Sequence, residues 1–207
     1  TLSKEVGFVR KPHGGRLRVA LAFPNVYFVG MSNLGFQTVY RLFNARDEVV
    51  CERVFLPLRP EVRARRAGGT PLRTLESQTP VADFDVLAFS VSFEWDYTNV
   101  VAMLRLAGLP VYAADRGADH PLVVLGGAVT FLNPEPLAPL VDVVAVGEGE
   151  VLVPELVEAA GSGAERGAML RRLAAATGFY VPSFYDVRYE AGGTIAGFVP
   201  RPGTGAP

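Results

Sequence analysis

The chain of 207 residues is 49% hydrophobic and 20% charged, the composition of a globular protein that buries a substantial core. Its net charge of −1 provides no overall attraction for nucleic acid or for an acidic membrane, and we expect neither as a partner. Cys51 is the single cysteine, which excludes an intrachain disulfide; with no signal-peptide pattern and no apolar run long enough to cross a bilayer, we expect a cytoplasmic location.

The first half of the chain alternates short apolar runs with amphipathic segments. Residues rich in Val, Leu and Phe, bounded by Pro or turn residues, predict strands, and apolar residues at helical spacing predict helices. The predicted strands are 18–24, 49–56 and 85–93, and the predicted helices are 34–44 and 97–107. Asn33 or Ser32 is expected to cap the first helix.

Residues 57–80 form a long connection rich in Pro, Arg and Gly. Loops of that length within a compact domain are usually functional or partly disordered. The connection contains a basic cluster, for which we expect a solvated loop or helix face; its members are Arg59, Arg63, Arg65, Arg66 and Arg73.

The second half continues the alternation and then changes character. The predicted elements are strands at 111–114, 122–125 and 141–146 and helices at 134–140, 151–160 and 165–176. Aromatic and β-branched residues on both sides of Gly192-Gly193 predict a hairpin. We therefore divide the chain into an arm (1–17), an α/β domain (18–162) and a small extension of helix, hairpin and linker (163–207).

The fold class follows from the strands, which are apolar on both faces. A parallel sheet covered by helices on both sides requires such strands. We expect a doubly wound, mostly parallel α/β sheet of Rossmann-like type, with the flavodoxin-like strand order 2-1-3-4-5.

In such a sheet, ligands bind beyond the carboxyl ends of the strands. The loops at that edge are 25–33, 90–96, 126–133 and 147–150, and each contains glycine, a small hydroxyl residue or a carboxylate. The residues of interest there are Gly30, Ser90, Ser92, Gly126, Gly127 and Glu148. Each also has a purely local explanation, such as a turn glycine or a carboxylate that stabilises a helix N-terminus. Trp95 offers either an apolar plate for a ligand or a packing residue.

The sequence contains no motif for a metal, catalytic or nucleotide site of a common kind. His13 and His120 lack a neighbouring carboxylate or cysteine at ligand spacing, and no catalytic triad, P-loop or zinc spacing is present. Gly147 and Gly149 do not continue into a dinucleotide-binding fingerprint, which argues against a nicotinamide dehydrogenase. We expect no catalytic residue and no metal ligand in this chain.

Taken together, the loops resemble those of cobalamin-binding domains. That family carries Asp-x-His-x-x-Gly after the first strand, a Ser-x-Leu type motif after the third and Gly-Gly after the fourth. This chain has Asn25-x-Tyr27-x-x-Gly30, then Ser90-x-Ser92, then Gly126-Gly127. The stretch from Arg18 to Val187 also resembles the N-terminal region of bacterial B12-binding-type radical SAM proteins.

The resemblance implies a cofactor module in a larger enzyme. Asn25, Gly30, Ser90, Ser92, Gly126, Gly127 and Glu148 would contact cobalamin, and Tyr27, Phe28 and Val29 would face the corrin ring. Tyr27 replaces the family histidine that ligates cobalt, and a phenol is a poor substitute for imidazole. The [4Fe–4S] cluster and S-adenosylmethionine are expected only in a C-terminal radical SAM barrel, the expected partner, because one cysteine cannot hold the cluster.

A second interpretation stays open at this stage. A domain can keep its fold and lose its ligand, in which case this chain would serve as a structural or interaction cap on the barrel. Tyr27 or Phe131 filling the groove would favour the cap, and an open cavity over Gly126-Gly127 would favour the cofactor. The substrate of the whole enzyme and the oligomeric state are not encoded in any motif.

Overall fold

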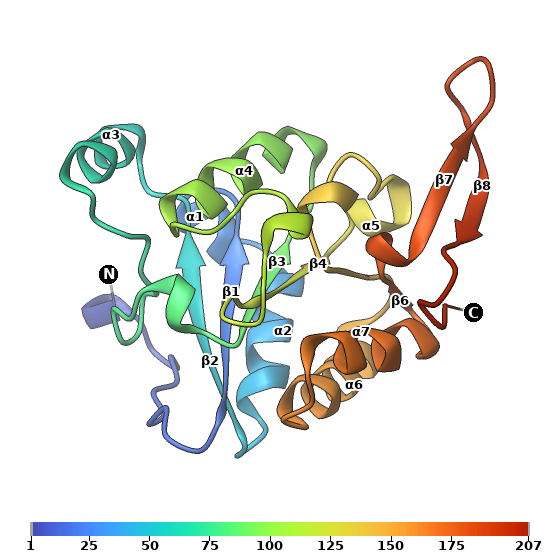
Figure 1. Cartoon of the computed structure of the whole chain (residues 1–207). Helices are drawn as coiled ribbons and strands as arrows, with labels where there is room; N and C mark the ends of the chain where they lie inside the picture. Colours follow the sequence, from blue (N-terminus) through green and yellow to red (C-terminus); the bar gives the residue numbers. More distant parts are fainter. Residues whose placement is uncertain (1, 207) are drawn as a thin grey trace.

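A computed structural model describes residues 2–206 and has a six-stranded sheet at its centre, in the order β2-β1-β3-β4-β5-β6 (Figure 1). The strands are β1 (Leu17–Phe23), β2 (Val49–Phe55), β3 (Val86–Ser90), β4 (Leu122–Gly126), β5 (Val143–Ala145) and β6 (Phe179–Tyr180). The first five are parallel and β6 runs antiparallel to β5. The predicted doubly wound sheet and its 2-1-3-4-5 order are confirmed, and β6 adds an unpredicted edge strand.

Helices cover both faces of the sheet. α2 (Leu34–Asn44), α6 (Gly149–Gly161) and α7 (Arg166–Ala175) belong to one side, and α4 (Tyr97–Leu106) belongs to the other. Successive residues of a strand point to opposite faces, so Val19 and Leu21 enter one cluster while Ala20 and Ala22 enter the other.

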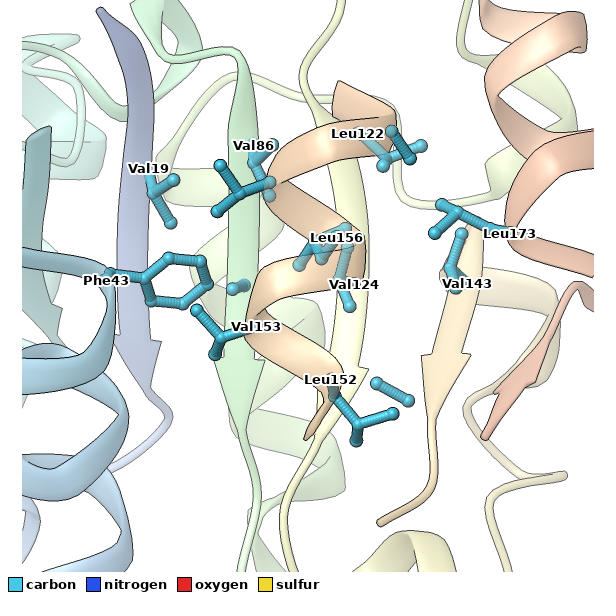
Figure 2. Close-up of a cluster of buried hydrophobic side chains, with 14 of the residues drawn as sticks. Val19, Phe43, Val86, Leu122, Val124, Val143, Leu152, Val153, Leu156 and Leu173 are labelled. Carbon is cyan, nitrogen blue, oxygen red and sulfur yellow. The ribbon is translucent and has the colours of Figure 1, made fainter. Parts of the chain in front are cut away.

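Figure 2 shows the cluster under α2 and α6. Phe43 of α2 and Val153 and Leu156 of α6 lie against Val86 and Val124 of the central strands. The strands are therefore buried on both sides, as their continuous apolar runs predict.

The longer predicted helices agree closely with the structure. The helix predicted at 34–44 is α2, and the side chain of Asn33 caps it by accepting a hydrogen bond from the Phe36 amide at 2.9 Å. The predictions at 97–107, 151–160 and 165–176 match α4, α6 and α7 within two residues at each end. The Gly192-Gly193 hairpin is also confirmed, as β7 (Tyr185–Tyr189) and β8 (Ile195–Pro200).

Two predictions are wrong in detail. Residues 111–114 form no strand and lead into a 3-10 helix, Ala113–Asp115, because β4 is already flanked by β3 and β5 and has no free edge. The helix predicted at 134–140 is reduced to the 3-10 turn Ala138–Leu140. Prolines at 134, 136 and 139 remove the amide donors that an α-helix would need there.

Short helices occupy segments that were expected to be loops. They are α1 (Tyr27–Met31), α3 (Arg59–Gly68) and α5 (Val129–Leu132). In α3 the Glu61 carboxylate accepts a hydrogen bond from the Leu58 amide, Pro60 stands in the first turn, and Gly69 ends the helix with a φ of 62°. The long connection is therefore partly ordered by local capping.

Buried charges protect the outer edge of β2. The Arg53 backbone amide donates to Glu76 at 2.7 Å, and the Arg53 guanidinium pairs with the same carboxylate at 2.6 Å. The N-terminal arm adds Glu5, whose carboxylate lies 2.8 Å from Arg53. His13 lies 2.9 Å from Glu52 on the same strand. These contacts attach the arm and residues 72–77 to an edge that would otherwise be exposed.

No helix within residues 2–206 is long and apolar enough to cross a membrane.

We expect Glu76→Gln to lower the free energy of unfolding by about 3 kcal/mol, because it leaves the buried Arg53 without its closest counter-charge. Urea unfolding followed by circular dichroism measures this loss. The matched control is Glu158→Gln, which breaks the exposed pair with Arg172 and should cost less than about 1 kcal/mol. Equal losses in the two variants would contradict the role given to the buried pair.

Candidate functional site

A cavity of about 460 Å³ opens at the carboxyl edge of the sheet. It lies between the strands and helices α2 and α6, where β1 and β3 lead to opposite faces of the sheet. Such a switch point is where open α/β sheets bind ligands. The volume falls within the range of small-molecule sites, roughly 300–1,000 Å³.

The cavity combines an apolar interior with a polar mouth. Leu21, Ala88, Val124 and Leu156 contribute apolar side chains from the strands and α6. The residues from the predicted site that line it are Ser90, Ser92, Gly126, Gly127 and Glu148. The structure therefore brings the second, third and fourth predicted loops together around one space.

Glycines shape this space in different ways. Gly127 has a φ of 98°, and a Cβ there would lie 2.4 Å from the carbonyl oxygen of Val91. It therefore allows the loops after β3 and β4 to touch. A Cβ on Gly126 would meet nothing nearer than 3.8 Å, so that residue leaves the cavity open.

Hydrogen bonds order the mouth on the side of α2. Asn33, which caps α2, donates from its side-chain amide to the hydroxyl of Ser92 at 3.0 Å. The hydroxyl of Ser90 has no side-chain hydrogen bond to any residue between 2 and 206. Ser92 therefore links two loops, whereas Ser90 offers a hydroxyl to a ligand.

The N-terminus of α6 forms the opposite side of the mouth. Glu148 precedes the helix, its side chain makes no capping bond, and both it and Glu150 are exposed at the cavity. Carboxylates accept hydrogen bonds from N–H and O–H groups. This side of the mouth therefore suits a ligand that carries amide or hydroxyl donors.

The three motif residues of the first predicted loop lie outside the cavity, although Asn33 at the end of that loop lines it. Asn25 donates to Asp96 at 2.9 Å, and the hydroxyl of Tyr27 donates to Glu5 at 2.5 Å. Burial, together with that bond, raises the pKa of Tyr27 to about 12. A Cβ on Gly30 would lie 2.5 Å from the ring of Phe55, so Gly30 allows α1 to pack against β2. None of the three residues lines the cavity, and their contact with a cofactor stays a prediction.

Exposed apolar side chains surround the carboxyl edge. We call this group the apolar rim; its members are Leu34, Phe93, Trp95, Phe131, Leu132 and Val151. Trp95 is 85% exposed, and Phe131, which also lines the cavity, is 63% exposed. These residues all come from segments at the carboxyl ends of the strands, where an apolar patch is a candidate binding surface. The sequence drew attention to Trp95 and Phe131, and the remaining members look like ordinary helix or loop residues until the fold places them at one edge.

No metal centre is present among residues 2–206, where no cluster of three or more His, Cys, Asp or Glu side chains could hold an ion. His13 bonds to Glu52, and the ring of His120 accepts a hydrogen bond from the Gly117 amide at 3.1 Å. Cys51 is fully buried, and burial raises the pKa of its thiol.

Comparison with known proteins gives one finding. A family model described as radical SAM proteins, N-terminal, matches residues 35–182. No curated protein and no solved structure matches the chain.

We expect Gly127→Ala to lower the free energy of unfolding by about 2 kcal/mol or more. Alanine is strained at this positive φ, and its Cβ collides with Val91 backbone. Gly192→Ala is the matched control, because a Cβ there meets nothing within 4 Å, and it should change stability by less than about 0.5 kcal/mol. Urea midpoints compare the two; a Gly127→Ala variant as stable as the control would refute the close approach.

Proposed function

Because this chain belongs to the family of N-terminal domains of radical SAM proteins, we propose that it binds cobalamin at the carboxyl edge of its sheet. The observation that carries the proposal is the coincidence of an open cavity with the apolar rim around it. A cavity alone suits many small ligands. A cavity surrounded by large exposed apolar side chains suits a ligand with a buried tail and a broad flat body.

The cavity fits the nucleotide tail of cobalamin in size and chemistry. Its interior is apolar, as an aromatic base requires, and the hydroxyl of Ser90 stands at the entrance. Gly126 lets a flat group approach the end of β4, because no Cβ projects there. In this proposal α2 and α6 exclude water from the tail on either side.

The rim fits the corrin ring and its amide side chains. Phe93, Trp95 and Phe131 offer apolar contact, and Glu148 and Glu150 accept hydrogen bonds from amide N–H groups. When bound, cobalamin would supply a cobalt centre that can carry a methyl group. The residues of this chain would bind and orient it.

This chain would not ligate the cobalt. Neither histidine lines the cavity, and the hydroxyl of Tyr27 is engaged with Glu5 in the arm. The metal would therefore take its lower ligand from the cofactor, from solvent or from another domain.

We further propose that the [4Fe–4S] cluster and S-adenosylmethionine bind in a separate barrel domain of the same cytoplasmic protein. The single cysteine, Cys51, cannot hold a cluster. The barrel would then cover the apolar rim and enclose the corrin ring between the two domains. This arrangement would bury surface that is otherwise exposed to water.

The empty-cap interpretation gains no specific support. Tyr27 lies outside the cavity, and Phe131, which lines it, is 63% exposed at its margin and does not fill it. An open space over Gly126 is the arrangement that favours a ligand.

We expect the purified chain to retain hydroxocobalamin in equilibrium dialysis, measured by corrin absorbance. Thr38→Trp should weaken retention by about tenfold or more, because Thr38 of α2 lines the cavity and an indole there would occupy the space of the tail. The corresponding control is Thr98→Trp, an exposed position in α4 outside the cavity, which should leave retention unchanged.

Retention should also be measured with the full-length protein that carries the barrel, prepared without oxygen. Absence of cobalamin from both preparations would overturn the proposal in favour of an empty cap. Equal retention by Thr38→Trp and Thr98→Trp would show that the cavity is not the site of the tail.

A further inference from the structure

Helix α3 concentrates positive charge in a segment that contributes little to the core. Its sequence, RPEVRARRAG, contains four arginines and one glutamate, and Val62 is the residue of α3 that packs against a core cluster. Figure 1 shows α3 standing apart from the sheet. Arg59 and Arg63 are exposed and add to this positive charge, but neither lines the groove beside the helix.

The surface beside α3 is a groove of about 700 Å³. Lys4, Arg65 and Arg73 line it, coming from the arm, from α3 and from the segment after it. Hydrogen bonds to backbone carbonyls hold the guanidinium groups in place, from Arg65 to Pro71 at 2.9 Å and from Arg73 to Gln78 at 2.7 Å. Both arginines are therefore ordered without a counter-ion.

Two carboxylates also line the groove, and both accept hydrogen bonds from within the fold. Glu5 pairs with Arg53 and accepts from Tyr27, and Glu61 caps α3. No ion pair within residues 2–206 involves Lys4, Arg59, Arg63, Arg65 or Arg73. The net charge of −1 conceals this local excess, because charges act mainly within about 10 Å in salt solution.

The groove also contains exposed apolar surface. Phe28, 80% exposed, and Leu58, 57% exposed, both line it. Ordered cations beside an exposed aromatic ring match the chemistry of single-stranded nucleic acid, whose phosphates pair with the cations and whose bases stack on the ring. An acidic peptide would use the cations and leave Phe28 unused.

We propose that the groove beside α3 binds single-stranded nucleic acid through its phosphates and at least one stacked base. The site is separate from the cobalamin cavity, but the two are close along the chain: α1, which carries Phe28, follows directly from β1, and Asn25 before it bonds to Asp96 in the loop of Trp95. A strand held in the groove would extend toward the apolar rim. Binding in the groove does not depend on cobalamin.

The test is the fluorescence anisotropy of a labelled single-stranded RNA of mixed sequence, about 20 nucleotides long, titrated with the intact chain over a range of salt concentrations starting near 50 mM. We expect Arg65→Glu combined with Arg73→Glu, two residues that line the groove, to weaken binding by about tenfold or more. The slope of log affinity against log salt should fall by about 1.4, since each lost phosphate contact on a single strand accounts for about 0.7. Arg65→Gln with Arg73→Gln, which adds no negative charge, should show the same trend in smaller degree.

Two further variants separate specific binding from general charge. Arg105→Glu combined with Arg188→Glu makes the same change in net charge at exposed positions outside the groove, and it should keep affinity within about twofold. Phe28→Ala keeps every charge and should weaken binding by about fivefold or more through lost stacking.

The outcomes divide clearly. Loss of binding in the groove variants alone supports the proposal, and tighter binding of RNA than of DNA of the same sequence would assign RNA as the ligand. Equal losses in the Arg105/Arg188 control, no binding by the unaltered chain at low salt, or displacement by polyglutamate of equal charge would overturn it. Cobalamin retention, measured on the Arg65/Arg73 variants, which change no residue of the cavity, reports separately on the cavity.

Discussion

The architecture depends on one constraint, which is that a parallel sheet must be covered on both faces. The strands β1, β3 and β4 send alternate side chains into two separate apolar clusters, with α2, α6 and α7 over one and α4 over the other. Crossover connections between parallel strands then bring the carboxyl ends of β1 and β3–β5 to one edge. The position of the candidate site is a consequence of that covering, because the chain leaves the sheet in opposite directions after β1 and β3.

At the carboxyl edge of the sheet the covering helices end, and the space over β4 stays open. Gly126 keeps the space over β4 open, while Gly127 draws the neighbouring loops together beside it. Large apolar residues such as Trp95 and Phe131 remain in water around the opening. A surface of this kind is costly for an isolated domain. Its presence is consistent with a family whose members form the N-terminal part of larger radical SAM proteins.

The outer edge of β2, in contrast, is covered by a network of buried charged residues. Here Arg53 is surrounded by Glu5 and Glu76, and Glu52 accepts hydrogen bonds from Thr74 and Ser77 at 2.5 and 2.6 Å. This buried network protects the edge strand and holds the arm against the domain. It also engages Glu5, Glu52 and Glu76, so these three carboxylates pair with Arg53 and His13 and with none of the cations beside α3. The same internal pairing that stabilises one edge thus leaves a positively charged groove next to it.

The sequence by itself determined the five parallel strands, their order and the longer helices, and it narrowed the cap of α2 to Asn33 or Ser32, because burial on both faces and helical periodicity leave a direct pattern in the residues. It also predicted that the loops after β3, β4 and β5 meet, since parallel strands end at one edge. It failed where local sequence and three-dimensional neighbours disagree, as at the strand predicted for residues 111–114 and the helix predicted for 134–140. It also gave no sign that Tyr27 and Gly30 lie in the short helix α1, against the arm and Phe55, while Asn25 bonds to Asp96 in the loop after β3. Only the tertiary structure decided that, as it decided the apolar rim and the basic groove, because both gather residues distant in sequence whose exposure depends on what the rest of the chain leaves uncovered.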